Sequence, residues 1–287
     1  MRPIETCRLC SGTDFVPYRN GVYGKDIYIC NNCQFVFTNP QPEPRELSAR
    51  YGAEYYQPWL RPAQRRRREK LWERRLAIVK SLRPCGKLLD VGCGEGLFLH
   101  CARQAGFCVA GVEISEFAAA YAKKEFGLNI QQTTLEEADW SPKTFDIITF
   151  WHTLEHLPFP DSSLQKAGQL LKPDGRLIVA VPNVNNIIEQ GFYRLVKGHY
   201  FPIYTAGAKE PHLYHFSATT LKLLLEKCGF QVVAIGADFA QVDPRWRVVE
   251  HISSLFSKLT GNQACMAILA VARKPAGETV GSKTVDS

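Results

Sequence analysis

Residues 87–96 read KLLDVGCGEG, and this stretch decides the fold that we expect. An apolar strand ends in the acid Asp90 and runs into three glycines at alternate positions, after which apolar residues open a helix. Glycines without Cβ let the backbone turn sharply and let a ligand approach the main chain. An acid at the carboxyl end of a buried strand repels phosphate but can pair with an amino group. The stretch therefore favours a ligand with an ammonium group and a ribose over a ligand with a pyrophosphate.

The segment Asp90–Gly96 resembles the first motif of class I S-adenosylmethionine-dependent methyltransferases. The resemblance implies that S-adenosylmethionine is the cofactor and that Asp90, Gly92 and Gly94 contact it. A dinucleotide-binding loop would need the spacing G-x-G-x-x-G, and the third glycine here comes one residue early. A glycine-rich turn without a ligand is the remaining alternative.

Strands and helices alternate after residue 87, which predicts a parallel sheet with helices on both faces. The resemblance implies a seven-stranded, Rossmann-like sheet whose last two strands form an antiparallel hairpin. We expect strands at 87–91, 108–113, 129–132, 145–150, 176–181, 230–237 and 264–273. We expect helices at 96–105, 115–126, 162–171 and 217–229, with a turn at 173–175.

The 287 residues are 45% hydrophobic and 22% charged, which is ordinary globular composition. No apolar run approaches the roughly 20 residues of a membrane span. The first residues lack the apolar core of a signal peptide. The sequence therefore predicts a cytoplasmic protein.

Four of the ten cysteines are paired by their spacing: Cys7, Cys10, Cys30 and Cys33. Two Cys-x-x-Cys turns separated by nineteen residues can complete a tetrahedral zinc site. A segment this small has little core, so the metal would supply its folding free energy. We expect a structural Zn²⁺ in a zinc-ribbon-like unit over residues 1–38.

The strand and helix pattern, the local composition and the family resemblance lead us to expect four further divisions. Residues 39–83 are an aromatic linker or lid followed by a basic helix, and residues 84–273 are the methyltransferase domain. Residues 183–216 are an insertion that covers the substrate, and residues 274–287 are a disordered tail.

The helix expected at 63–82 carries apolar residues on one stripe and arginines on its other faces. Residues 61–83 hold ten Lys and Arg against two Glu, a local charge of +8. A solvated surface is the plainer interpretation. The alternative is an anionic partner, either a phosphate-bearing substrate, a nucleic acid or a membrane surface.

Several further residues are predicted to line the adenosyl pocket. Glu113 ends the second strand, where a carboxylate accepts hydrogen bonds from ribose hydroxyls. The family resemblance implies that Ile114 packs on the adenine and that the 134–137 loop meets it. The same resemblance implies that the loop after the fourth strand lies beside the sulfonium of the cofactor. It also implies that a tyrosine of the linker contacts the cofactor. The residues implied in this way are Ile114, Leu135, Glu136, Trp151, His152 and Tyr56.

Residues 152–156 also match H-x-x-E-H, an inverted zinc-peptidase motif. That motif has to lie on a helix. Here it follows a strand directly, and Pro158 and Pro160 would truncate a helix. We therefore reject a metallopeptidase.

Residues 211–217 read PHLYHFS and supply the candidate catalytic groups His212, Tyr214 and His215. A methyl acceptor has to lose its proton, and histidine can accept one near neutral pH. The segment resembles one in zinc-bearing deoxysugar C-methyltransferases, in which a Glu-His pair precedes Phe-Ser. His212 matches that histidine, whereas Pro211 replaces the glutamate. The alternative is that these side chains only pack beneath a lid.

We therefore expect methyl transfer from S-adenosylmethionine to a small-molecule acceptor, such as a nucleotide-linked sugar or another anionic metabolite. One alternative is a zinc-anchored protein that binds nucleic acid or modifies RNA. A second is a non-catalytic adaptor with a methyltransferase fold. The sequence predicts no oligomeric state.

Overall fold

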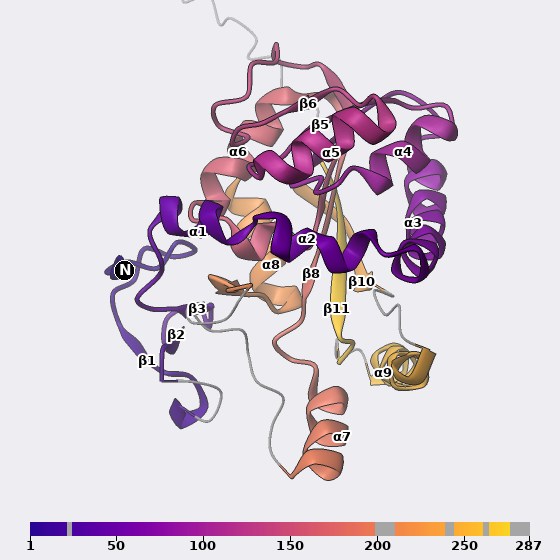
Figure 1. Ribbon diagram of the computed structural model, residues 1–287. Coiled ribbons are helices and arrows are strands. Elements are labelled where there is room, and N and C mark those ends of the chain that lie inside the picture. The colour runs from indigo at the N-terminus through magenta and orange to yellow at the C-terminus, as the bar shows by residue number, and fades with distance from the viewer. Residues whose placement is uncertain (22–24, 199–209, 239–243, 261–263, 276–287) are drawn as a thin grey trace, which may run out of the picture.

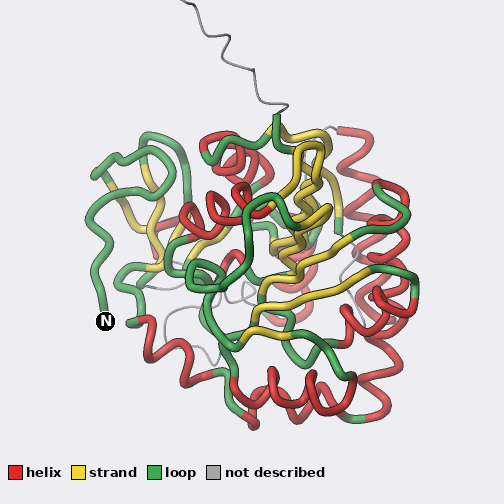
Figure 2. The backbone as a smooth tube through the Cα atoms, turned by 90° about the horizontal axis from the view of Figure 1, so that it is seen from above, coloured by secondary structure: helices red, strands yellow, loops and turns green. Residues whose placement is uncertain are grey.

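The computed structural model describes residues 1–21, 25–198, 210–238, 244–260 and 264–275. Its main sheet has seven strands, with helices on either side (Figures 1 and 2). In spatial order the strands are β10 (Gln231–Ala237), β11 (Ala267–Arg273), β8 (Leu171–Pro182), β7 (Phe145–Trp151), β4 (Lys87–Val91), β5 (Cys108–Val112) and β6 (Ile130–Gln131). The predicted fold class is confirmed.

Strand polarity also matches the expectation. The central and outer strands from β8 to β6 pair in parallel, whereas β11 pairs antiparallel with both β8 and β10. The predicted hairpin is wrong in one respect, because α9 (Pro244–Thr260) lies between β10 and β11. The antiparallel pairing needs no tight turn, so the chain can leave the sheet and return.

The predicted start of the fifth strand, at residue 176, is also wrong. The strand β8 begins at Leu171, which pairs with Phe145 of β7. A register shift between Phe145 and Ile147 absorbs the residues that we expected to form a turn.

Apolar side chains alternate between the two faces of the sheet, as the period of a strand requires. Leu177, Val179 and Val181 of β8 belong to one buried cluster, and Ile178 and Ala180 belong to the other. The second cluster is covered by α3 (Pro62–Leu82), α4 (Leu97–Gln104) and α5 (Glu116–Phe126). The first is covered by α6 (Pro160–Leu170) and α8 (Ala218–Lys227).

The caps of these helices follow the local sequence. Ser115 accepts a hydrogen bond from the Ala118 amide, and Gly127 ends α5 in the left-handed conformation. Ser217 caps α8 in the same way through Thr220. Both helices therefore begin at a serine N-cap.

A second sheet contains β1 (Phe15–Pro17), β2 (Ile27–Cys30), β3 (Val36–Thr38) and β9 (Tyr214–His215). The last of these strands comes from the predicted insertion and pairs antiparallel with β3. Phe35 and Phe37 share one buried cluster with Tyr214 and Phe216. The N-terminal unit is therefore built in part from a segment about 175 residues further along the chain.

The remaining helices are α1 (Pro44–Arg50), α2 (Ala53–Leu60) and α7 (Ile187–Lys197), with short 3-10 turns η1 (Tyr18–Gly21) and η2 (Leu154–His156). The helices α1 and α2 form most of the predicted linker, and α7 lies beside α9 below the sheet (Figure 1). Residues 199–209 of the insertion and 276–287 of the predicted tail lie outside the described residues. No helix within the described ranges is both long enough and apolar enough to span a membrane.

Candidate active site and cysteine cluster

The turn after β4 crosses the carboxyl ends of two neighbouring strands. Gly92, Gly94 and Gly96 all have positive φ, between 54° and 82°. The amide nitrogens of Gly92 and Cys93 donate to the Val112 carbonyl of β5. A Cβ on Gly96 would lie within 2.8 Å of Leu128 and Ala122 side-chain atoms, so glycine is required there.

Asp90 lies at the end of β4, and its side chain is buried. It accepts a hydrogen bond from the Thr149 hydroxyl at 2.6 Å. Burial raises the pKa of its carboxyl to about 8, and the Thr149 hydrogen bond and the Arg75 charge offset only part of that rise. A cation bound beside Asp90 would favour the ionised form.

This pKa predicts a pH dependence that can be isolated with Asp90→Asn. An unfolded Asp titrates near 3.9. Between about pH 4 and pH 8 the folded protein therefore binds more protons at this site than the unfolded chain does. The contribution of Asp90 to the free energy of unfolding falls as pH rises through that window, and it is constant above about pH 8.

We expect the melting temperature of Asp90→Asn, relative to that of the parent protein, to increase from pH 5 to pH 8. Thermal unfolding at several pH values measures this difference. Asp139→Asn, at an exposed position, is the control and should show no such trend. A difference for Asp90→Asn that does not vary with pH would contradict the assignment.

Glu113 follows β5 directly and faces the same turn. Its carboxylate accepts from the amides of Gly94 and Ser115, each at 2.8 Å. Burial raises the pKa of the Glu113 carboxyl, although these two amides and the Tyr56 hydroxyl counteract it. A ribose would replace the Tyr56 hydroxyl as a donor to this carboxylate.

Tyr56 of α2 lies over the turn. Its ring is buried, stacks against Phe117 and lies 3.4 Å from the position that a Cβ of Gly94 would take. Two carboxylates at the ends of neighbouring strands can accept hydrogen bonds from an amino group and a ribose, and main-chain amides lie between them. The residues present thus fit S-adenosylmethionine.

The other predicted cofactor contacts differ in accessibility. Ile114 is 38% exposed beside Glu113, whereas the Leu135 side chain is buried in the core. The Glu136 carboxylate accepts a hydrogen bond from Ser163. The side chain of Leu135 is therefore closed to a ligand, while Ile114 presents its side chain.

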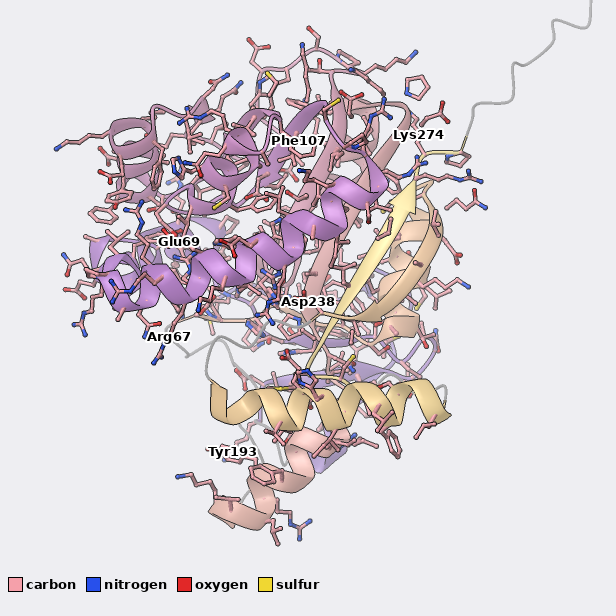
Figure 3. All side chains as sticks on the ribbon, turned by 90° about the vertical axis from the view of Figure 1, so that its right-hand side faces the viewer. Arg67, Glu69, Phe107, Tyr193, Asp238 and Lys274 are labelled. Carbon is pink, nitrogen blue, oxygen red and sulfur yellow. The ribbon has the colours of Figure 1, made fainter. Side chains whose placement is uncertain are left out.

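Trp151 and His152 lie beside a buried charge network that the sequence did not reveal. Arg75 of α3 forms an ion pair with Asp238, which lies just after β10 beside α3 (Figure 3). The Arg75 guanidinium lies 4.7 Å from the Trp151 ring centroid, and His152 Nε2 lies 3.2 Å from Asp238. The predicted placement of the arginines away from the apolar stripe of this helix is therefore wrong for Arg75.

The network sets the charge state of its members. Burial alone would raise the pKa of Asp238, but Arg75 and His152 hold it well below its usual range. Burial alone would lower the pKa of His152, but the carboxylates of Asp238 and Glu155 raise it instead. The position of Asp238 directly after a predicted strand is the sequence feature that could have marked it as a candidate site residue.

The second polar cluster lies where η2 meets the segment 210–212. The Nδ1 of His156 donates to the Pro211 carbonyl at 2.9 Å, and its Nε2 lies 3.4 Å from Glu210. The rings of His156 and His212 pack edge to face, with centroids 4.8 Å apart. Burial and the neighbouring histidines hold the pKa of His212 well below its ordinary value, so its imidazole is neutral.

The predicted catalytic residues do not all lie in this cluster. His215 Nε2 lies 3.2 Å from the Thr38 hydroxyl, and burial lowers the pKa of His215 to about 3. Tyr214 stacks on Phe35 and donates to the Pro158 carbonyl. Both side chains pack within the N-terminal sheet, and His212 alone of the three lies beside His156 and Glu210.

An aromatic segment joins the two polar clusters. Tyr55 donates to Glu210 at 2.8 Å and packs edge to face on both Tyr51 and Tyr56. The Tyr56 hydroxyl in turn forms a hydrogen bond with the Glu113 carboxylate. Residues 51–56 therefore span from the glycine turn to the histidine cluster.

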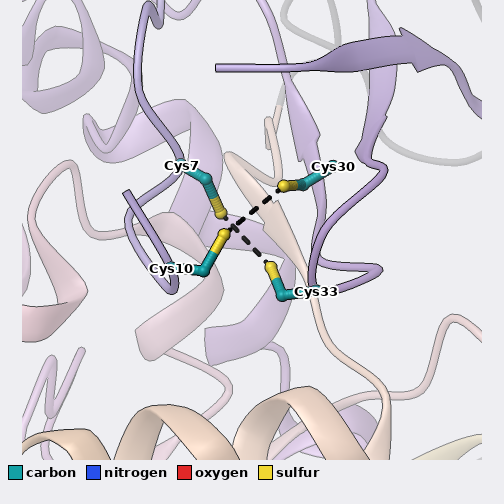
Figure 4. Close-up of side chains that lie close together, drawn as sticks. All are labelled: Cys7, Cys10, Cys30 and Cys33. Atoms are coloured by element: carbon teal, nitrogen blue, oxygen red, sulfur yellow. Dashed lines mark hydrogen bonds between the residues drawn. The ribbon is translucent and has the colours of Figure 1, made fainter. Parts of the chain in front are cut away.

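The four N-terminal cysteines converge on one point (Figure 4). The Cys7 and Cys33 sulfurs are 3.5 Å apart, and those of Cys10 and Cys30 are 3.6 Å apart. A disulfide would need about 2.05 Å, whereas thiolates about 2.3 Å from one zinc ion would lie roughly 3.8 Å apart. All four are free thiols, and this donor set fits Zn²⁺.

Residues 63–235 match the model of a family described as a methyltransferase domain. This is more than half of the chain, so the chain belongs to the methyltransferase-domain family. The fold is that of the class I S-adenosylmethionine-dependent methyltransferases.

Relatives and solved structures agree with that family. The chain is 39% identical over 107 residues to a ubiquinone biosynthesis O-methyltransferase from Haemophilus ducreyi, a match that covers 34% of this chain and 45% of that protein. The chain thus spans just under half the length of the curated relatives that it matches.

Two solved structures show the same fold, each with a TM-score of 0.55. An S-adenosylmethionine-dependent methyltransferase from Thermotoga maritima is 21% identical and matches over 80% of this chain and 98% of its own. The 1,6-didemethyltoxoflavin-N1-methyltransferase of Burkholderia thailandensis, with S-adenosylhomocysteine bound, is 18% identical and matches over 85% of this chain and 97% of its own.

Proposed function

We propose that the protein transfers the methyl group of S-adenosylmethionine to a small-molecule acceptor. The observation that carries this proposal is the aromatic segment 51–56, which links the carboxylates at the glycine turn to the histidine cluster. One side fits the cofactor, and the other offers groups that can handle an acceptor proton. S-adenosylmethionine supplies an activated methyl group at its sulfonium.

In this proposal Asp90 pairs with the amino group of the cofactor and Glu113 accepts hydrogen bonds from its ribose. The glycine turn, including Gly92 and Gly94, lets the ligand approach the main chain. Ile114, the Leu135 backbone, Glu136, Trp151 and His152 complete the predicted contacts, and Tyr56 closes over them. Positioning of the two reactants supplies much of the rate.

The acceptor side comprises His212 together with His156 and Glu210. The neutral His212 imidazole can accept a proton from an acceptor hydroxyl. His215 and Tyr214 support this cluster, because Thr38 joins His215 to the main chain of His212. The curated relatives are O-methyltransferases, which supports an oxygen acceptor.

The acceptor class includes nucleotide-linked sugars and other anionic metabolites. Three basic side chains of α3, Arg65, Arg68 and Arg75, are already paired with carboxylates. The exposed Arg66, Arg67 and Lys70 remain available to an anion. Nucleic acid is the second candidate partner, and strongly salt-dependent binding to tRNA or duplex would favour it.

We further propose that Cys7, Cys10, Cys30 and Cys33 hold a structural Zn²⁺. Four cysteine thiolates leave no open coordination position for catalysis. Because β9 joins the same sheet, the ion would support the segment that carries His212.

Release of S-adenosylhomocysteine across a panel of hydroxylated metabolites tests methyl transfer. We expect at least one acceptor to be methylated and His212→Ala to reduce kcat by 10²-fold to 10⁴-fold. Exposed His251→Ala is the matched control and should retain the parent rate. Unchanged turnover in His212→Ala would remove it from the acceptor site.

A further inference from the structure

Three groups in the acceptor-side cluster have the chemistry of metal ligands. A carboxylate oxygen of Glu155 and one ring nitrogen each of His156 and His212 all lie within 4.8 Å of one another. The main chain fixes this arrangement, because the Leu213 amide donates to the Glu155 carbonyl at 2.8 Å. Two segments more than fifty residues apart are therefore held in register at this point.

The Glu155 carboxylate is the unusual member of the cluster. Glu155 is 1% exposed, and in the described part of the chain no hydrogen-bond donor reaches either carboxylate oxygen. The Nδ1 of His152 lies 3.6 Å from Oε1, and the Nε2 of His156 lies 3.9 Å from it. Burying a carboxylate without hydrogen bonds is costly, and a bound cation is one of the few groups that compensate for it.

The hydrogen bond of His156 prepares it as a ligand. Its Nδ1 proton goes to the Pro211 carbonyl at 2.9 Å, which leaves Nε2 on the side of Glu155 and Glu210. Histidines that bind metals commonly donate their other ring nitrogen to a carbonyl in this way. The main chain of His212 is also fixed, because the Thr38 hydroxyl donates to its carbonyl at 2.6 Å.

The main competing explanation is a metal-free ion pair. Protonated His156 would then share its Nε2 proton between Glu210 and Glu155. Those contacts are 3.4 and 3.9 Å, longer than the 2.7–2.9 Å of a charge-assisted hydrogen bond. The spacing leaves room for an ion between the groups instead.

We propose that Glu155, His156 and His212 bind a divalent transition-metal ion, with Zn²⁺ as the best match. Two imidazoles and one carboxylate are a ligand set of open, catalytic zinc sites, which keep a position for water or substrate. His152 is not a ligand, so the site does not use the H-x-x-E-H pattern as a unit. This site is separate from the four cysteines.

The role of the ion rests on the proposed function. An acceptor hydroxyl in the open position would lose its proton to solvent more readily. Its oxygen would then form the new bond to the methyl carbon while the bond from that carbon to sulfur breaks, which releases S-adenosylhomocysteine. In this scheme His212 would act as a ligand in place of the proton acceptor of the proposed function, and the metal would promote proton loss to solvent.

Metal content of the full chain, measured after saturation with Zn²⁺ and removal of the excess, tests the proposal. We expect two zinc ions per parent chain and one per chain in both Glu155→Gln and His212→Ala. Glu116→Gln, at an exposed position, should retain two. One zinc ion in the parent chain, or two in the variants, would overturn the second site.

Co²⁺ titration of the parent chain settles the matter even if a variant fails to fold. Cysteine-bound Co²⁺ has sulfur-to-metal charge-transfer bands, and a site of nitrogen and oxygen ligands has none. We expect a second equivalent to bind without adding such bands, whereas saturation at one equivalent would overturn the proposal. Neither readout depends on activity, so a protein with two metals and no methyl transfer would contradict the proposed function alone.

Discussion

Replacing Cys30 by serine is expected to unfold the N-terminal sheet. Structural zinc sites contribute apparent free energies of about 10–16 kcal/mol at pH 7, as large as the whole stability of a typical domain. Cys30 is completely buried at the end of β2, and β3 and β9 extend the same sheet. The loss should therefore spread to the segment that holds His212.

Zinc content, circular dichroism and limited proteolysis measure this outcome. We expect Cys30→Ser to lose the zinc of the cysteine cluster and to be cleaved rapidly within residues 1–38. The matched control is Cys85→Ser, because Cys85 is an exposed cysteine far from the cluster in sequence. A Cys30→Ser protein that keeps parent zinc content and protease resistance would contradict the zinc assignment.

Arg75→Ala should destabilise the methyltransferase domain by about 3–5 kcal/mol, because it leaves Asp238 charged and unpaired in the interior. The side chains of Arg75 and Asp238 are 4% and 2% exposed. The guanidinium also packs over the rings of Trp72 and Trp151, so the truncation removes apolar contacts as well.

The neighbouring Arg74→Ala is the control, since Arg74 is exposed on the same helix. Its effect on denaturant-induced unfolding should stay within about 0.5 kcal/mol. The double variant Arg75→Met/Asp238→Leu should recover much of the loss, because apolar residues of similar volume often replace a buried pair without cost. Equal stabilities of Arg74→Ala and Arg75→Ala would show that the pair contributes nothing.

Local signals were enough to predict the sheet and the convergence of Asp90, Glu113 and the glycine turn. The glycine turn, the acids at the ends of β4 and β5 and the Ser115 cap each depend on residues within a few positions. The spacing of the cysteine pairs also predicts that they converge, because one metal ion with four thiolate ligands requires all four cysteines. Such features depend little on the packing of distant segments, so the sequence could predict them.

Features that depend on distant partners could not be predicted. Arg75 lies among the buried apolar residues of α3, contrary to the expectation, and its partner Asp238 comes from a strand end more than 160 residues further along the chain. Pairing of β9 with β3 is equally non-local. The cluster around Glu155 was missed because the H-x-x-E-H match was rejected for lack of a helix. Only the folded chain brings His212 beside Glu155 and His156, while the Nε2 of His152 pairs with Asp238.

Calorimetric titration with S-adenosylmethionine tests the central claim most directly. We expect saturable binding with one cofactor per chain, weakened about 10–100-fold in Glu113→Ala through the loss of charged hydrogen bonds. Glu116→Ala, three residues further on and exposed, should bind like the parent protein. Absence of saturable binding, or equal affinity in the parent protein and Glu113→Ala, would contradict the account.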